Sequence, residues 1–333
     1  MAEALVDTYG RVHRDLRISV TDRCNFRCTY CMPAEGMDWL PRSEVLTFEE
    51  VERIARVCVE RFGVDSIRLT GGEPTVRAHL PVLVGKVAAL RTDDGRPVDL
   101  ALTTNGATLR SVAADLREAG LRRVNVSLDT LRHDRFVTLT RRDELDHVLE
   151  GIDAAVAAGL DPVKVNVVVM RGVNDDEIVD LAEFGRDRGV TVRFIEWMPL
   201  DADRQWQSEA VVSQAEIVAA IDAVHPIDPV ARGSQPAERF VYRDGAGEVG
   251  VIPSVTRPFC DSCDRIRLTA EGQLRSCLFA VDEADLRALV RGGATDDDVA
   301  DAVRRCVAGK WAGHMIGQVA FVRPRRSMSQ IGG

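Results

Sequence analysis

The sequence TDRCNFRCTYCMP, residues 21–33, places three cysteines within eight residues, directly after a short strand-like run. Cys24, Cys28 and Cys31 have the spacing C-x3-C-x2-C, which is typical of thiolates that bind zinc or an iron-sulfur cluster. A closed structural zinc site needs four ligands, and the nearest histidine, His13, belongs to the far side of the strand. Three thiolates on a four-iron cluster leave one iron open. The loop therefore predicts a cluster that also binds a small molecule.

Around this loop, residues 16–199 repeat a strand-like run, a loop and an amphipathic helix. The segment 47–63 shows the helical part, because Thr47 and Glu50 form a capping box and Gly63 supplies a C-terminal stop. Six such alternations predict a parallel sheet with helices on its outer face. The predicted strands are LRISVT (16–21), SIRLTGG (66–72), DLALTTNG (99–106), RVNVSLD (123–129), VKVNVVVM (163–170) and TVRFIEWMP (191–199).

One face of these strands is polar, although strands of a helix-covered parallel sheet usually read as continuous apolar runs. Arg17 and Ser19 share a face of the first strand, and Lys164 and Asn166 share a face of the fifth. Such a face must line water or a ligand, because burying unpaired polar groups is costly. We therefore predict an α/β fold, a partial β/α barrel of TIM type with about six strands and a polar lumen.

Two points of this fold prediction stay open. An antiparallel sheet with one wet face is the alternative, and the helix between each pair of strands argues against it. The sixth strand does not show which of its faces is inward, since Glu196 and Met198 lie opposite Arg193 and Trp197.

Charge and hydropathy exclude several classes of function. The 333-residue chain has a formal net charge of −9, which opposes general electrostatic binding to nucleic acid or to an anionic membrane. No window approaches the ~18 uninterrupted apolar residues of a membrane span, and the first residues lack the apolar run of a signal peptide. The sequence thus predicts a cytoplasmic protein with reduced cysteines, no nucleic-acid partner and no membrane segment.

The pattern changes toward the C-terminus, so we divide the chain into a barrel domain, 1–204, and a smaller domain, 205–333. The smaller domain carries a second group of cysteines with the spacing C-x2-C-x13-C, namely Cys260, Cys263 and Cys277. A zinc ribbon completed by His314 is the alternative to a second cluster. Cys58 and Cys306 fit helical apolar repeats and are predicted to be core residues.

The first cysteine loop, with Tyr30 in C-x3-C-x-Y-C, resembles the signature of the radical S-adenosylmethionine (SAM) enzymes. One strand later stands TGGEP, residues 70–74, and that superfamily binds the SAM amino group with a GGEP segment. The resemblance implies that SAM chelates the open iron and that the reduced cluster cleaves it to methionine and a 5′-deoxyadenosyl radical. Both motifs lie at C-terminal strand ends, where β/α barrels place their active sites.

Two arginines between the later cysteines indicate an anionic substrate. Arg265 and Arg267 alternate in DRIRL, so in an extended strand both side chains point the same way. Two such guanidinium groups can bind a triphosphate through bidentate, charge-assisted hydrogen bonds, and Arg17 on the first strand can complete the set.

Together these motifs resemble the GTP 3′,8-cyclase family of molybdenum cofactor biosynthesis over nearly the whole chain. The matching segments include RLTGGEPTVR, LTTNG, VNVSLDT, VKVNVVVMRGVND, RFIEWMP, CDSCDRIRLTAEGQLRSC and the terminal Gly-Gly. The resemblance implies two [4Fe-4S] clusters, one that holds SAM and one that holds the guanine of GTP. It also implies that the deoxyadenosyl radical removes the ribose C3′ hydrogen of GTP and that C3′ attacks guanine C8.

Correspondence with that family assigns a role to each site residue. The cluster ligands are Cys24, Cys28, Cys31, Cys260, Cys263 and Cys277. The SAM contacts are Tyr30, Gly72, Ser127 and Met198. The GTP contacts are Arg17, Arg68, Thr103, Lys164, Arg265, Ile266 (through its backbone) and Arg267. The catalytic residues are Arg17, Arg265, Arg267 and the terminal Gly332 and Gly333.

The same resemblance implies partners. They are GTP, a low-potential electron donor of the flavodoxin or ferredoxin type, and the downstream cyclic pyranopterin monophosphate synthase, while a homodimer is left open. One alternative is a radical SAM enzyme that modifies peptides, which needs a peptide groove. The other is a zinc or electron-transfer module without catalysis, which leaves the polar lumen and the GGEP segment unexplained.

Overall fold

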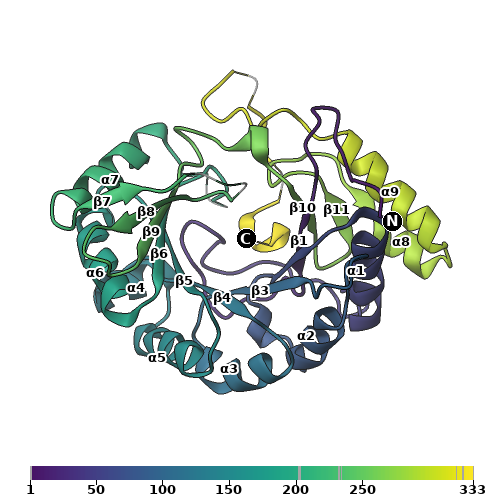
Figure 1. The fold of residues 1–333 in the computed structure, drawn as a ribbon, viewed down its shortest axis with the longest axis horizontal. Helices are drawn as coiled ribbons and strands as arrows, with labels where there is room; N and C mark the ends of the chain where they lie inside the picture. The colour runs from purple at the N-terminus through teal and green to yellow at the C-terminus, as the bar shows by residue number, and fades with distance from the viewer. Residues whose placement is uncertain are drawn as a thin grey trace.

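The computed structural model describes residues 2–201, 204–231, 233, 235–319, 321–324 and 326–332. Its main feature is one 12-stranded sheet that curves around a lumen, with helices on the outer face (Figure 1). The strands are β1 (Asp15–Ser19), β2 (Ser66–Thr70), β3 (Asp99–Thr104), β4 (Arg123–Ser127), β5 (Val163–Val169), β6 (Thr191–Glu196), β7 (Ile227–Pro229), β8 (Glu238–Tyr242), β9 (Glu248–Ile252), β10 (Arg265–Leu268), β11 (Gln273–Arg275) and β12 (Ala284–Asp285). The helices are α1 (Phe48–Phe62), α2 (Leu80–Ala88), α3 (Leu109–Glu118), α4 (His133–Thr140), α5 (Leu145–Ala157), α6 (Ile178–Arg188), α7 (Gln214–Asp222), α8 (Leu286–Arg291), α9 (Asp296–Ala308) and α10 (Met328–Ile331). Within the described residues, no helix is both long enough and apolar enough to cross a membrane.

Strands β1 to β6 pair in chain order and in parallel, which confirms the predicted α/β fold and excludes the antiparallel alternative. The six predicted strands form only half of the sheet, whose order is β12-β11-β10-β1-β2-β3-β4-β5-β6-β9-β8-β7. Because β12 and β7 lie at opposite ends, the barrel is open and not closed.

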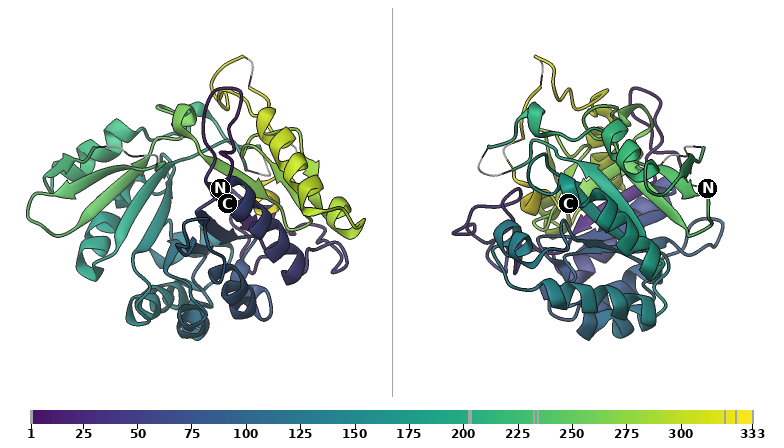
Figure 2. Two further views of the ribbon diagram at one scale, coloured as in Figure 1. Left: turned by 45° about the vertical axis from the view of Figure 1, so that its right-hand side comes forward. Right: turned by 90° about the vertical axis from the view of Figure 1, so that its left-hand side faces the viewer.

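The C-terminal part of the chain extends the sheet at both ends. Strand β10 pairs in parallel with β1, and β9 pairs in parallel with β6. Strands β8 and β9 form an antiparallel hairpin outside β6. The left view of Figure 2 shows the two extensions of the sheet apart from each other, with β7 to β9 on one side and the segment from β10 to α9 on the other. The division at residue 204 stays a prediction, since strands from both parts share one sheet.

Helix α1 shows how local sequence forms the outer layer. The Thr47 hydroxyl accepts a hydrogen bond from the Glu50 amide, and the Glu50 carboxylate accepts one from the Thr47 amide, as the capping box predicts. Gly63 ends the helix with a φ of 66°, a left-handed conformation that glycine adopts without strain. Cys58 lies on the buried face of α1, which confirms it as a core residue.

The apolar core lies between the sheet and its helices. Ile18, Leu69 and Val126 alternate with polar neighbours on β1, β2 and β4, and their side chains are fully buried in that layer. The alternating polar residues therefore face the lumen. The short helix α10 lies in the middle of the lumen as seen in Figure 1.

Candidate functional site

A cavity of about 450 Å³ occupies the lumen, and polar side chains from most strands of the sheet line it. The structure therefore confirms the predicted polar lumen. The predicted site residues that border this cavity are Arg17, Tyr30, Arg68, Thr103, Ser127, Lys164, Met198, Cys260, Cys263, Arg265, Arg267 and Cys277.

Three arginines stand side by side on adjacent strands of the lumen wall. Arg17 on β1 is in register with Arg68 on β2 and with Arg267 on β10. The Nε atoms of Arg17 and Arg68 are buried and have no hydrogen-bond partner among the described residues. Burial, and next to it repulsion from Arg17, lowers the pKa values of Arg68 and Arg267 well below their ordinary range. Asp15 is 3.9 Å from Arg17 Nε, so one carboxylate stands against three guanidinium groups. Such an excess of buried positive charge is unfavourable, so this wall favours a bound anion.

Arg265 extends this basic wall toward the second cysteine group. Its guanidinium carbon lies 4.5 Å from the centre of the Phe259 ring. Its Nε and Nη2 atoms are buried without a hydrogen-bond partner among the described residues. The guanidinium therefore keeps donors free for a ligand in the cavity.

Two further cations face the lumen from β5 and β6. Burial, and then the neighbouring Arg193, lowers the pKa of Lys164 to about 8. Burial lowers the pKa of Arg193 to about 9, and its Nε and Nη2 atoms donate to Asn166 Oδ1 at 3.0 and 2.8 Å. The sequence left the inward face of β6 open, and the structure places Arg193 on it. Asn166 is its register partner on β5, and this pairing is not readable from the sequence.

The first cysteine loop is held by the backbone of the GGEP segment. The Gly72 amide donates to Thr21 O at 2.7 Å, and the Glu73 amide donates to Arg23 O at 2.8 Å. A Cβ atom on Gly72 would lie 2.4 Å from Arg23 O and 2.5 Å from Asp22 O. Glycine is thus required for backbone to pack on backbone, and Gly72 does not itself border the main cavity.

Glu73 connects this segment to the strand that follows. Its buried carboxylate accepts hydrogen bonds from the Thr104 hydroxyl at 2.6 Å and the Asn105 amide at 2.6 Å. The Asn105 side chain donates to Asn25 Oδ1 at 2.8 Å and lies 4.0 Å from Cys24 Sγ. Sequence reasoning located these motifs but assigned Glu73 and Asn105 no role. Here they fix the loop against β3.

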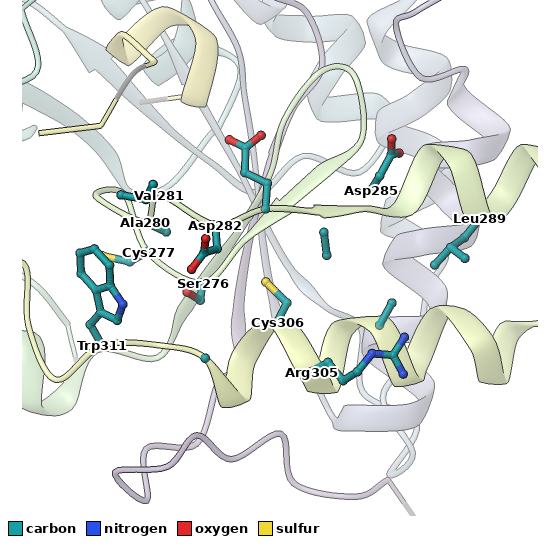
Figure 3. Close-up of a pocket in the computed structure, with 14 residues that line it drawn as sticks. Ser276, Cys277, Ala280, Val281, Asp282, Asp285, Leu289, Arg305, Cys306 and Trp311 are labelled. Atoms are coloured by element: carbon teal, nitrogen blue, oxygen red, sulfur yellow. The ribbon is translucent and has the colours of Figure 1, made fainter. Parts of the chain in front are cut away.

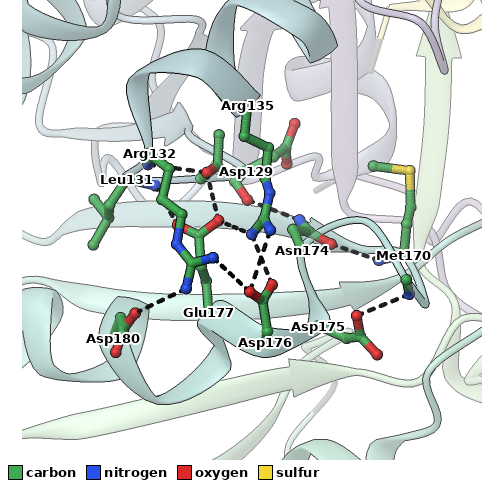
Figure 4. Close-up of polar contacts among 12 residues, drawn as sticks. Asp129, Leu131, Arg132, Arg135, Met170, Asn174, Asp175, Asp176, Glu177 and Asp180 are labelled. Carbon is green, nitrogen blue, oxygen red and sulfur yellow. Dashed lines mark hydrogen bonds and ion pairs between the residues drawn. The ribbon is translucent and has the colours of Figure 1, made fainter.

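Tyr30 is anchored to the end of β4. Its hydroxyl donates to Asp129 Oδ2 at 2.5 Å, while Asp129 Oδ1 accepts from the Val168 amide at 2.8 Å. Burial raises the pKa of Asp129 to about 6. The side-chain Nδ2 of Asn174 donates a hydrogen bond to the backbone carbonyl of Asp129 at 2.7 Å, as Figure 4 shows.

A network of charged residues around Glu177 holds the segment that directly follows Asp129. The fully buried Glu177 carboxylate accepts from the Thr130 hydroxyl at 2.6 Å and the Leu131 amide at 2.8 Å, and it pairs with Arg135 (Figure 4). Arg135 also donates to Asp176 at 2.7 Å. This network was not predicted, since its members come from separate loops.

The donor set at the first loop fits an iron-sulfur cluster. Burial raises the pKa of Cys24 to about 12 and that of Cys31 to about 11, so thiolates need a positive partner there, which iron supplies. Cys28 borders a small cavity of about 30 Å³ together with Tyr30 and Ser127. The first cysteine group therefore lies next to the predicted SAM contacts.

The second cysteine group lies across the lumen, with all three side chains on the main cavity. Burial opposes ionisation of Cys263, but the neighbouring Arg265 and Lys310 outweigh it and lower its pKa. Both ring nitrogens of His314 are engaged by backbone, Nε2 with Ser254 O at 2.9 Å and Nδ1 with the Ile316 amide at 3.1 Å. In the described part of the chain, no three His, Cys, Asp or Glu side chains converge on a single metal ion. A zinc ribbon completed by His314 is thus disfavoured.

Comparison with known proteins assigns the family. Residues 18–185 match the model of the radical SAM superfamily, and residues 190–316 match that of Molybdenum Cofactor Synthesis C. The chain is 51% identical to the GTP 3′,8-cyclase of Streptomyces coelicolor, over 100% of this chain and 97% of that protein. The chain belongs to the GTP 3′,8-cyclase family. The corresponding protein of Rhodopirellula baltica is 50% identical over 99% of this chain and 92% of its own length.

A solved structure supports the fold. The crystal structure of Streptococcus suis SuiB bound to S-adenosylmethionine has a TM-score of 0.59 and 13% identity, and covers 95% of this chain and 77% of that chain. This GTP 3′,8-cyclase family member is therefore a radical SAM enzyme of molybdenum cofactor biosynthesis, which uses SAM and an iron-sulfur cluster.

The tail of this family member enters the lumen. The Gly332 carbonyl accepts a hydrogen bond from Arg267 Nη1 at 2.5 Å. Gly332 has a φ of 84°, and a Cβ atom there would lie 2.7 Å from Thr70 Oγ1. The structure thus brings Gly332 to the arginine wall, whereas Gly333 lies outside the described residues. Ile266 is fully buried and does not border the cavity.

A second cavity, of about 470 Å³, lies outside the lumen between β12 and α9 (Figure 3). It is bordered by Cys306, by Trp311 and by acidic residues such as Asp282. Cys277 borders both cavities. Cys306 is half-buried, and its thiol donates weakly to Leu274 O at 3.5 Å, which fits a packing role.

Proposed function

We propose that this protein converts GTP to (8S)-3′,8-cyclo-7,8-dihydroguanosine 5′-triphosphate, the first step of molybdenum cofactor biosynthesis. One observation carries the proposal: a single cavity holds a wall of buried arginines, several of whose N–H groups have no partner among the described residues, and the second cysteine group, and the first cysteine loop adjoins it. The arginines suit a triphosphate, and the cysteines suit two [4Fe-4S] clusters. The family relationship selects GTP among nucleotides.

The residues take the following roles in this proposal. Cys24, Cys28 and Cys31 hold the first cluster, and Cys260, Cys263 and Cys277 hold the second. SAM is held by Tyr30, Gly72, Ser127 and Met198. GTP is held by Arg17, Arg68, Thr103, Lys164, Arg265, Ile266 and Arg267. Arg17, Arg265, Arg267, Gly332 and Gly333 orient the reacting ribose and guanine.

SAM on the first cluster supplies the 5′-deoxyadenosyl radical that removes the hydrogen from ribose C3′. The arginine wall fixes the triphosphate, which restricts how the ribose can lie between the two cysteine groups. C3′ then bonds to guanine C8, and one electron and one proton complete the dihydro product. The tail reaches the arginine wall through the Gly332 carbonyl, so it is positioned to help orient the bound nucleotide.

The remaining partners follow from this reaction. It needs a low-potential electron donor, of flavodoxin or ferredoxin type, and its product passes to a cyclic pyranopterin monophosphate synthase. A cytoplasmic location suits these partners, and we leave a homodimer open. The net charge of −9 supports the expectation of no nucleic-acid partner.

The test is anaerobic reconstitution followed by an iron count and product analysis. We expect about eight irons per chain, and formation of 5′-deoxyadenosine and the cyclised nucleotide with GTP. SAM cleavage that depends on a peptide and not on GTP would favour the peptide-modifying alternative. Bound zinc without SAM cleavage would exclude radical chemistry altogether.

The pH dependence of GTP binding tests Lys164. Its lowered pKa of about 8 means that the ammonium is present at pH 7 and lost as the pH rises through 8. We expect GTP affinity to fall about fourfold between pH 7 and 8.5, a range that stays below the pKa of about 9 of Arg193, because one charge-assisted hydrogen bond disappears. Lys164→Arg keeps its charge and is expected to flatten the profile. An equally steep profile in this variant would show that another group titrates.

The tail glycine is tested by Gly332→Ala. The added Cβ meets Thr70 at 2.7 Å and requires a φ of 84°, so the tail must shift from Arg267. We expect turnover to fall about tenfold or more with iron content unchanged. Gly317→Ala is the matched control, because Gly317 has a φ of 80° with no atom within 4 Å of the new Cβ. Equal loss of iron and turnover in Gly332→Ala would contradict a role in orienting substrate.

A further inference from the structure

Lys310, just after α9, is one of three lysines in the chain and is only 4% exposed. Lysine is almost never so buried unless its charge is paired. Among the described residues, Lys310 forms no ion pair with a carboxylate. Its ammonium instead lies behind the second cysteine group, where nothing in the proposed reaction requires it.

The three N–H groups of Lys310 have four acceptor atoms within reach. Nζ donates to Arg265 O at 2.8 Å and contacts His13 Nδ1 at 3.4 Å. It also lies 3.6 Å from Cys263 Sγ and 3.4 Å from Cys263 O. The ammonium therefore holds Arg265, the first residue of β10, and Cys263 just before it, and one of its N–H groups lies within reach of both the carbonyl and the sulfur of Cys263.

His13 accepts from Lys310 only as the tautomer that carries its proton on Nε2. Its Nε2 lies 3.1 Å from Asp7 Oδ2, so this proton has an acceptor. Burial, and then the charge of Lys310, lowers the pKa of His13 to about 4, so the ring is neutral near pH 7 and Nδ1 is free to accept. Asp7 is fixed in turn by Arg11 Nε at 2.6 Å.

The same N-terminal segment supports the other cysteine of C-x2-C. Arg11 Nη1 donates to Cys260 O at 2.8 Å and to Ala312 O at 2.8 Å. Asp7 thus anchors Arg11 directly and Lys310 through His13. Arg11 in turn contacts Cys260, and Lys310 contacts Cys263.

We propose that Lys310, held by His13 and Asp7, is a positioning residue of the second cysteine site, which donates an N–H to the Cys263 sulfur and favours the reduced state of the cluster bound there. The proposal rests on the proposed second cluster. A positive charge and a hydrogen bond at a ligand sulfur offset the negative charge that the cluster gains on reduction. Loss of Lys310 therefore lowers the reduction potential of that cluster.

The experiment measures the second cluster alone. Full-length protein with Cys24, Cys28 and Cys31 replaced by serine retains only the second cysteine group, and reconstitution is expected to give about four irons per chain. Lys310→Met in this background removes the charge and keeps the aliphatic stem. The potential is measured by a redox titration followed by electron paramagnetic resonance. We expect the equilibrium constant for reduction of the cluster to fall about tenfold, which lowers the reduction potential by about 59 mV for one electron.

Lys86→Met is the matched control, because Lys86 is a surface lysine of α2 that pairs with Glu52 at 3.2 Å. It is expected to leave iron content and potential unchanged. Lys310→Gln keeps an N–H donor without the charge, so it is measured in parallel in case the methionine variant does not fold. We expect its potential to fall by less than that of Lys310→Met.

The outcomes separate the proposal from the proposed function. A folded Lys310 variant with the iron content and potential of the parent would overturn the role of Lys310 and leave the second cluster standing. A parent protein without iron would overturn the second cluster and this proposal with it. A lowered potential in both Lys310 variants, with the Lys86 control unchanged, would support the assignment.

Discussion

Gly72→Ala is expected to abolish SAM cleavage, with a loss of at least about 100-fold. The new Cβ would lie 2.4 Å from Arg23 O and 2.5 Å from Asp22 O, and both atoms are backbone that no rotamer change can move. The loop before Cys24 must therefore shift, and misplacement of about 1 Å near a reacting group costs about 100-fold in rate. Iron content of the first cluster and 5′-deoxyadenosine formation measure the effect.

Gly85→Ala serves as the control for this substitution. Gly85 lies within α2, its nearest new contact is Ala119 O at 3.9 Å, and alanine favours a helix over glycine by about 1 kcal/mol. Wild-type SAM cleavage and equal or higher stability are expected. Full activity in Gly72→Ala would mean that the loop tolerates displacement and that the close packing of GGEP is incidental.

Arg68→Met is expected to change stability and binding in opposite directions. Without ligand, Arg68 is a buried cation beside Arg17 with an unpaired Nε, so its removal relieves repulsion and desolvation. The melting temperature of the nucleotide-free protein should rise by roughly 2–4 °C for each kcal/mol gained. With GTP, a buried charge-assisted contact is lost, and affinity should fall about 100-fold.

Thermal melts with and without GTP separate the two effects. Wild-type protein should gain stability from GTP, whereas Arg68→Met should gain much less at the same concentration. Arg110→Met is the control, because Arg110 is an exposed residue of α3 that pairs with Glu150 at 2.8 Å on the outer surface. A destabilised Arg68→Met protein that binds GTP normally would show that Arg68 is a structural residue.

The sequence pattern was sufficient to predict which side chains face the lumen wherever the alternation within one strand decides it. Lys164 shows this: once residues 163–170 are assigned as a strand, the period of two fixes its face, and the structure places it on the cavity. The same rule placed Arg17, Arg68 and Thr103. The cysteine spacing likewise identified both groups, because the ligands of each group lie close together in sequence.

Positions that depend on contacts between distant segments could not be predicted. Nothing local to Arg17 indicates that β10, and with it Arg267, would become its neighbour. Asp129 and Glu73 read as ordinary loop carboxylates until the structure shows which donors surround them. Arg193 stayed undecided because both faces of its strand carry polar residues, so the pattern favours neither.

The pairing of β10 with β1 determines when the sheet can be completed during synthesis of the protein. Arg267 follows Arg17 by 250 positions, so at about 5–20 residues per second the ribosome adds it roughly 12 to 50 s later. Until then one edge of β1 is unpaired and open to association with other chains. The nascent chain can fold β1 to β6 early, yet its arginine wall is completed only near release from the ribosome. Premature termination before residue 265 would therefore leave a sheet with an exposed edge and an arginine wall that lacks Arg265 and Arg267.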